Sequence, residues 1–139
     1  MIIDKNRNKQ NVLAVIHARE GSKRIPNKNI KLFHGKPIIS YPIDVAKKSA
    51  LFSKIIVSTD DSEIATVALS CGAEVPFLRP SELANDYAST DEALIHALHW
   101  LDEQKLFFEY VCCIYPANPL INEKYLKEGL NLLKTGCFH

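Results

Sequence analysis

The sequence lacks the excess of basic residues that is typical of a protein that binds a nucleic-acid duplex. Seventeen Lys and Arg residues stand against 16 Asp and Glu residues in 139, so the formal net charge is only +1. Nucleic acid is therefore not an expected partner. No apolar run is long enough to span a bilayer, and the polar first ten residues do not resemble a signal peptide. These absences predict a cytoplasmic protein with no membrane partner.

The sequence also lacks a cysteine pattern of the kind that binds zinc. It contains four cysteines, Cys71, Cys112, Cys113 and Cys137. Their spacing matches none of the usual zinc-ligand patterns. We expect four reduced thiols, as is usual in a cytosolic protein.

Two familiar phosphate-binding motifs are missing as well. Neither G-x-x-x-x-G-K-[ST] nor G-x-G-x-x-G occurs. The chain is therefore neither a P-loop protein nor a carrier of the usual dinucleotide fingerprint.

What is present is a regular alternation of strand and helix patterns. Short apolar runs predict strands at 11–17, 54–60, 73–78 and 110–115. Amphipathic stretches predict helices at 36–52, 62–71, from 89 onward and at 123–134. Pro37 is expected in the first turn of the first helix. Asp61 or Ser62 is expected to cap the start of the second helix, and Gly72 to follow its end. This order predicts an α/β fold with a mostly parallel sheet and helices on both faces, similar to Rossmann-like domains.

The same alternation suggests how the chain is organised. Residues 1–11 are expected to be a polar N-terminal tail and residues 12–139 a single nucleotide-binding domain. The pattern stops where a further strand is expected, so the domain is predicted to be incomplete.

Four loops follow the predicted strands, and ligands of open α/β sheets bind at the carboxyl ends of strands. The first loop, Ala18–Asn29, carries four cations, Arg19, Lys23, Arg24 and Lys28, with Gly21 and Ser22 at its bend. Lysine and arginine neutralise phosphate charge, and glycine lets the backbone approach a ligand closely. So many cations in one loop suit a triphosphate better than a monophosphate.

The residues of this loop resemble a family signature. "AREGSKRIPNKN" is similar to the A-R-x-G-S-K-x-x-x-x-K-N pattern of the CMP-sugar synthetases, the acylneuraminate cytidylyltransferases. Further similar segments follow in order: "GKPIISYPIDVAKKS", "IIVSTDDSEIATVALSCGAEV", "FLRPSELANDYAST" and "CCIYPANPLI". The segment "VPFLRPSELANDYAST" and a tyrosine at position 115 look most like the pseudaminic acid branch.

The resemblance implies a fold and a reaction. The fold is the nucleotide-diphospho-sugar transferase-like domain, and the family transfers CMP from CTP to a nonulosonic acid sugar, releasing pyrophosphate. The products serve surface glycans or flagellin glycosylation. Family members need Mg²⁺ and form homodimers. Their magnesium ligands and dimerisation segment are expected in a C-terminal part that this sequence does not contain.

The resemblance also implies roles for individual residues. Arg19 and Lys23 match the catalytic cations. The expected CTP-binding residues are Arg19, Ser22, Lys23, Lys28, Asn29, Arg79, Ser89 and Thr90. Tyr115 and Asn118 occupy the loop that faces the acceptor sugar, and no metal ligand is expected in this chain.

Two residues depart from the family pattern, and other interpretations stay open. His17 stands where the family usually has proline, and Glu20 adds a carboxylate among the cations. Alternative hypotheses are a truncated, non-catalytic CTP-binding chain, or synthesis of CMP-sialic acid or CMP-Kdo.

Two further pairs, one of histidines and one of aspartates, have simpler interpretations than a metal site. His96 and His99 lie three residues apart on a predicted helix, where a metal site would need a third ligand. We expect them at the solvent face and its edge. Asp60 and Asp61 are expected to cap a helix rather than to bind a metal.

Overall fold

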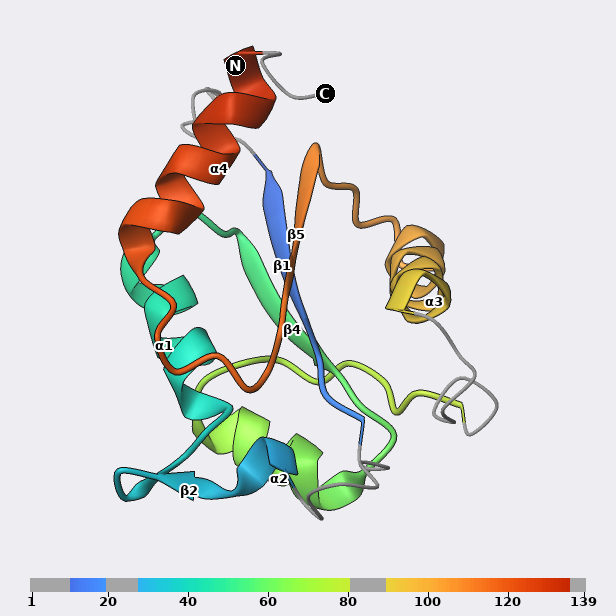
Figure 1. The fold of residues 1–139 in the computed structure, drawn as a ribbon. Helices are drawn as coiled ribbons and strands as arrows, with labels where there is room; N and C mark the ends of the chain where they lie inside the picture. Colours follow the sequence, from blue (N-terminus) through green and yellow to red (C-terminus); the bar gives the residue numbers. More distant parts are fainter. Residues whose placement is uncertain (1–10, 20–27, 81–89, 136–139) are drawn as a thin grey trace, which may run out of the picture.

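The fold is a parallel sheet between two helical layers, as the computed structural model in Figure 1 shows. The structure describes residues 11–19, 28–80 and 90–135. The strands among them are β1 (Val12–His17), β2 (Leu32–Phe33), β3 (Lys36–Pro37), β4 (Lys54–Ser58) and β5 (Tyr110–Ile114). The helices are η1 (Lys28–Ile30), α1 (Ser40–Ser49), α2 (Ser62–Ser70), α3 (Thr90–Glu103) and α4 (Glu123–Thr135). The predicted α/β class is therefore confirmed.

Strand β1 lies at the centre of the described sheet, whose order is β4-β1-β5. Both neighbours are parallel to it; the pairs run from Leu13↔Lys54 to His17↔Ser58 on one side. On the other side they end at Ile16↔Ile114. A central parallel strand is covered on both faces, which explains why the apolar run "VLAVI" is buried throughout.

Each face of the sheet has its own hydrophobic core. Ala14, Ile16 and Val57 pack with residues of α1 and α2. On the opposite face Leu13, Val15 and Ile56 pack with α3 residues, including Ala97 and Leu101. Figure 1 shows α1 and α4 on one side of the strands and α3 alone on the other. Alternate residues of β1 thus serve opposite cores, as strand geometry requires.

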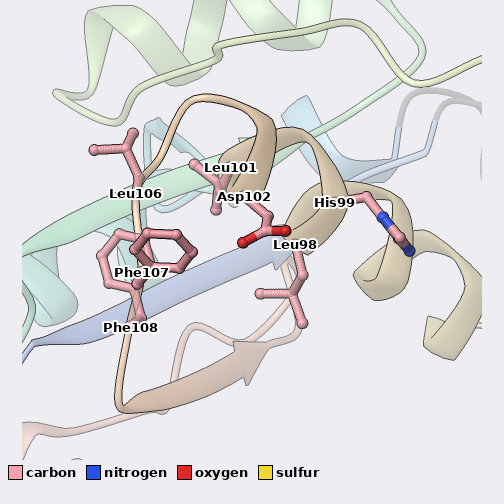
Figure 2. A pocket seen from close by; sticks show the side chains of 7 residues that line it. All are labelled: Leu98, His99, Leu101, Asp102, Leu106, Phe107 and Phe108. Carbon is pink, nitrogen blue, oxygen red and sulfur yellow. The ribbon is translucent and has the colours of Figure 1, made fainter.

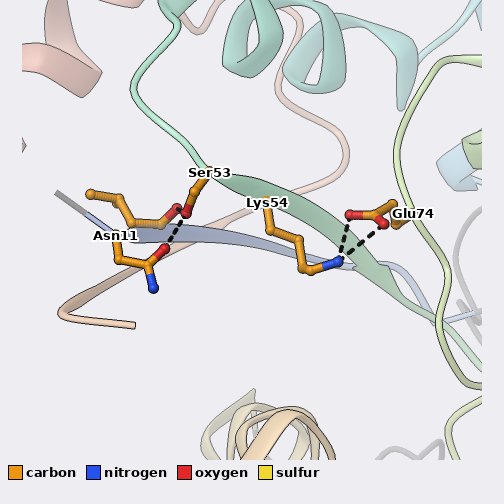
Figure 3. Close-up of polar contacts among 5 residues, drawn as sticks. Asn11, Ser53, Lys54 and Glu74 are labelled. Carbon is orange, nitrogen blue, oxygen red and sulfur yellow. Dashed lines mark hydrogen bonds and ion pairs between the residues drawn. The ribbon is translucent and has the colours of Figure 1, made fainter. Parts of the chain in front are cut away.

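Polar contacts hold the starts of the strands in register, as Figure 3 shows. The Ser53 hydroxyl donates to Asn11 Oδ1 at 2.6 Å, and the Ser53 N–H donates to the Val12 carbonyl at 2.9 Å. Lys54 forms an ion pair of 3.0 Å with Glu74, which lies beyond β4. Both partners are partly exposed, so this pair contributes little stability and mainly orients the edge.

The helix predicted from residue 36 begins later, and Pro37 is not in its first turn. Lys36 and Pro37 form β3, which pairs with β2 across a tight turn at His34 and Gly35. Both turn residues have positive φ, 50° and 80°, as a two-residue hairpin turn favours. This hairpin was not predicted. Pro42 lies in the first turn of α1 instead, where a backbone N–H has no helical partner.

The strand predicted at 73–78 is present only as two isolated parallel bridges, Ile56↔Glu74 and Thr59↔Leu78. Pro76 has no N–H to donate, which accounts for the missing ladder between the bridges. The capping predictions for α2 are confirmed. Asp61 accepts a bond from the N–H of Ile64 at 3.0 Å, and Gly72 follows the helix with a φ of 96°.

Candidate functional site

The strand order predicts that a ligand binds at the carboxyl end of β1. From β1 the chain crosses through α1 to β4 on one side, and later returns through α3 to β5 on the other side. The carboxyl ends of parallel strands with such a reversal form the usual binding crevice of open α/β sheets. The residues that follow β1 are Ala18 and Arg19, where the basic loop begins. Its start therefore lies at the expected position.

Arg79 is held at this edge by contacts with the end of β4. Its side chain is buried, with 6% exposure. Nε lies 3.2 Å from the Ser58 hydroxyl oxygen and one terminal nitrogen 2.9 Å from the Ser58 carbonyl. Its backbone N–H donates to Thr59 at 2.7 Å. Arg79 was predicted from the sequence to bind CTP, and these contacts give it a fixed position.

Three charged groups influence one another around Arg79. Burial lowers the pKa of Arg79, the Asp60 carboxylate opposes this shift, and the positive charge of Arg19 adds to it. The two arginines, one following β1 and the other following the segment beyond β4, are thus close enough to repel each other. An anion bound at this edge would relieve that repulsion.

His17, the last residue of β1, lies near Arg79 and belongs to the same cluster of residues at the sheet edge. Both of its ring nitrogens are buried and have no hydrogen-bond partner among the described residues. Burial lowers the pKa of His17 to about 4, and the positive charge of Arg79 contributes to the shift. The imidazole is therefore neutral at pH 7, with one N–H and one free lone pair. Buried polar groups without partners are uncommon in native proteins.

Asn29 joins the two ends of the basic loop. Its side-chain N–H donates to the Arg19 carbonyl at 2.8 Å, and its backbone carbonyl accepts from Ile39 at 3.2 Å. The amide oxygen is buried and has no partner in the described part of the chain. Asn29 was predicted to contact CTP. In the free chain it closes the loop, with its amide oxygen still available.

The other predicted residues lie in different surroundings. Lys28 is exposed in η1, and Thr90 is the first residue of α3. Tyr115 follows β5 and is 74% exposed, while Asn118 is half-buried and its carbonyl accepts from Ile121 at 3.4 Å. The remaining predicted site residues, together with the departure at Glu20, lie outside the described residues: Ser22, Lys23 and Ser89.

Sequence reasoning did not assign Ser58 or Asp60 to this site, and it left the role of His17 open. Ser58 and His17 are paired in the sheet register, so both end their strands at one level. Alternation along β1 and β4 could have indicated them. Val15 of β1 and Ile56 of β4 belong to the core under α3. His17 and Ser58 lie two positions further along these strands, so their side chains are on the same face of the sheet.

The described acidic and histidine residues do not form a metal centre. In residues 11–19, 28–80 and 90–135, no three His, Cys, Asp or Glu side chains are grouped so as to hold a metal ion. Asp61 caps α2, as predicted. His99 is exposed, and the half-buried His96 packs edge-on against Phe77, with 4.9 Å between ring centroids. Within the same ranges, no helix has the length and apolar character needed to cross a membrane.

A second hollow lies away from the cluster, and Figure 2 shows the side chains around it. This cavity of about 330 Å³ lies between the C-terminal half of α3 and the segment leading to β5. Leu98, Leu101, Leu106, Phe107 and Phe108 line it together with His99 and Asp102. Its lining contains a carboxylate and no lysine or arginine, so its chemistry does not suit a nucleoside triphosphate.

Curated relatives share much of this sequence. The chain is 47% identical over 117 residues to pseudaminic acid cytidylyltransferase of Campylobacter jejuni, covering 84% of this chain and 50% of that protein. It is 38% identical over 124 residues to CMP-N,N'-diacetyllegionaminic acid synthase of Legionella pneumophila, covering 89% and 53%. The chain therefore spans about half the length of these relatives.

A solved structure has the same fold at low sequence identity. It is CMP:2-keto-3-deoxy-manno-octonic acid synthetase in complex with CTP, with a TM-score of 0.76 and 23% identity. The match covers 91% of this chain and 48% of that one. The cytidylyltransferase family model matches residues 13–136, almost the whole described chain. Together with the relatives above 30% identity, this match shows that the chain belongs to the cytidylyltransferase family.

Proposed function

We propose that this chain provides the CTP-binding half of an enzyme that transfers CMP from CTP to a nonulosonic acid sugar, with pyrophosphate as the second product. The observation that carries the proposal is the cluster of Arg19, Arg79 and His17 at the carboxyl end of β1. The 47% identity to a pseudaminic acid cytidylyltransferase favours pseudaminic acid as the acceptor.

The proposed reaction is an in-line displacement. The anomeric hydroxyl oxygen of the sugar attacks the α-phosphorus of CTP and loses its proton, and the bond from the α-phosphorus to the bridging oxygen of pyrophosphate breaks. Negative charge spreads over the phosphoryl oxygens in the transition state, where fixed cations stabilise it. Arg19 is the described residue proposed for this role, together with Lys23 of the same basic loop.

Arg79 is suited to binding a phosphate group from a fixed position, without moving during the reaction. Because Ser58 and Thr59 already hold its side chain and backbone, its position changes little when a ligand arrives. A preorganised cation stabilises phosphate charge without a reorganisation penalty at the moment of reaction. We propose Lys28, Asn29, Ser22, Ser89 and Thr90 as the remaining nucleotide contacts, from the family resemblance.

The acceptor sugar is proposed to bind beside Tyr115 and Asn118. Register supports this position, since Ile16 pairs with Ile114 and the next residues, His17 and Tyr115, follow at the same level. An exposed phenol beside the nucleotide edge offers both an aromatic face and a hydroxyl to a sugar.

The family resemblance implies Mg²⁺, and the described residues do not fit a magnesium site. Of the two acids after β4, Asp61 is engaged as a helix cap and Asp60 neighbours Arg79. The resemblance also implies a homodimer in the cytoplasm, where CTP is made; light scattering on a chromatography column tests the dimer.

The test is pyrophosphate release by the purified 139-residue chain given CTP, Mg²⁺ and pseudaminic acid. We expect this chain alone to bind CTP, and we expect release that depends on both substrates from an enzyme that also contains the C-terminal part. Sialic acid and Kdo, each supplied instead of pseudaminic acid, test the choice of acceptor. No CTP binding by this chain would contradict the proposal. CTP binding without release, from the longer enzyme as well, would favour a protein that only binds the nucleotide.

A further inference from the structure

His17 occupies the middle of the proposed site. Ser58, which contacts Arg79, pairs with His17 on one side of β1. On the other side of β1, Ile16 pairs with Ile114 of β5, so the next residue, Tyr115, lies at the level of His17. His17 thus stands between the residue proposed to bind phosphate and the residue proposed to bind the sugar.

The side chain of His17 faces the α3 side of the sheet, as Ser58 does. Val15 and Ile56 both belong to the core beneath α3, and residues two positions further along a strand share its face. The contact between Arg79 Nε and the Ser58 hydroxyl oxygen lies on this same face. The imidazole and the contacting end of the guanidinium group therefore lie on the same face of the sheet, at the ends of β1 and β4.

Both ring nitrogens of His17 are buried and without a partner among the described residues. A buried donor or acceptor without a partner destabilises the free protein, and a ligand that supplies the partner regains this free energy. Because one nitrogen of a neutral imidazole is an acceptor, its partner has to be a donor. Phosphate oxygens accept hydrogen bonds, whereas hydroxyl groups both donate and accept.

We propose that His17 is a further ligand-binding residue of this site, which forms a hydrogen bond with a ligand hydroxyl group lying between Arg79 and Tyr115. The hydroxyl belongs either to the ribose of the nucleotide or to the acceptor sugar. This inference rests on the proposed function. The family usually has proline at the position before its signature, where this chain has His17, so the bond is a property of this chain rather than of the shared chemistry.

The matched variants are His17→Phe, which keeps a flat ring and removes both nitrogens, and His17→Asn, which keeps a donor and an acceptor. Calorimetry measures the affinity of each for CTP, for tripolyphosphate, and for pseudaminic acid in the presence of a methylene analogue of CTP. We expect His17→Phe to weaken CTP or the sugar about five- to tenfold, with partial recovery in His17→Asn. Tripolyphosphate affinity stays unchanged.

The melting temperature separates this role from a structural one. An apolar ring that replaces unpaired nitrogens is expected to leave the free chain as stable as before or more stable. A loss of ligand affinity together with an unchanged or higher melting temperature supports the inference. Unchanged affinity for both CTP and the sugar overturns it, and so does an equal loss for tripolyphosphate.

A measurement on the unmodified chain tests the inference even if a variant does not fold. The ring nitrogens are shielded in the free chain, so forming the bond requires a local opening and changes their surroundings. We expect the ¹⁵N resonances of His17 to shift when CTP, or CTP analogue plus sugar, is added. If saturating ligand leaves these resonances unchanged, the inference about His17 is contradicted and the proposed function is not. No binding of CTP by the wild-type chain removes the proposed function and this inference with it.

Discussion

Lowering the pH below 6.5 is expected to destabilise the chain through His17. Burial, and next the charge of Arg79, lower the pKa of His17 from 6.5 to about 4 in the folded state. In the unfolded chain the pKa returns to about 6.5. Between these values the unfolded chain takes up the proton and the folded chain does not. The free energy of unfolding therefore falls as the pH falls through this window.

The size of the effect follows from the same two values. One pKa unit corresponds to about 1.4 kcal/mol, so the full loss from this group is about 3 kcal/mol once the pH is below 4. At pH 5 about 2 kcal/mol of it is already lost. This is a large share of the stability of a small domain, which is typically about 5–15 kcal/mol.

Urea denaturation between pH 7.5 and pH 5 measures the effect, with His17→Phe as the control. Carboxylates also titrate at acid pH, but they are common to both proteins, so the difference between the two unfolding free energies isolates the histidine. We expect this difference to change by about 2 kcal/mol over that range, with the wild type losing more. Two parallel pH profiles would refute the assignment of a buried, neutral His17.

Substitutions at other positions test the fold and the basic loop. Gly72→Ala is expected to lose about 1–2 kcal/mol in urea denaturation, because its φ is 96° and a Cβ would meet a lysine side chain. Gly35→Ala, at a φ of 80° in open space, is the matched control and loses less. Asp61→Ala removes the α2 cap and costs about 1 kcal/mol, which Asp61→Asn largely restores. Arg19→Ala and Lys23→Ala should each weaken CTP binding several-fold or more in calorimetry, since a hydrogen bond to a charged group contributes about 1.5–3 kcal/mol; unchanged affinity in both would contradict the loop's role.

Local patterns were sufficient for the elements that carry their own signal. "VLAVI" predicted a covered central strand because a run of branched apolar residues suits a strand buried on both faces. Asp61 and Gly72 marked the ends of α2 through cap chemistry that involves only neighbouring residues. The hairpin at 32–37 was missed because the pattern of the following helix was extended over Lys36 and Pro37, although the His34–Gly35 pair is a turn signal.

The site depended on contacts that no local pattern contains. His17 and Arg79 are 62 positions apart in the sequence, and their interaction becomes visible only when β4 brings Ser58 beside β1. Asn29 could be predicted as a site residue from the resemblance. Its bond to the Arg19 carbonyl, which closes the basic loop, needed the structure.

At the end of β1, charged arginines and a neutral histidine provide two different kinds of ligand contact. Arg79 keeps its positive charge although burial lowers its pKa, because a guanidinium is effectively always protonated and Asp60 lies near. That charge in turn helps to keep His17 neutral. The edge therefore offers fixed cations to phosphate groups and an uncharged hydrogen-bonding ring to the rest of the ligand. A third cation at position 17 would add to the repulsion between Arg19 and Arg79, so the neutral ring lets a polar contact exist where another charge would destabilise the free protein.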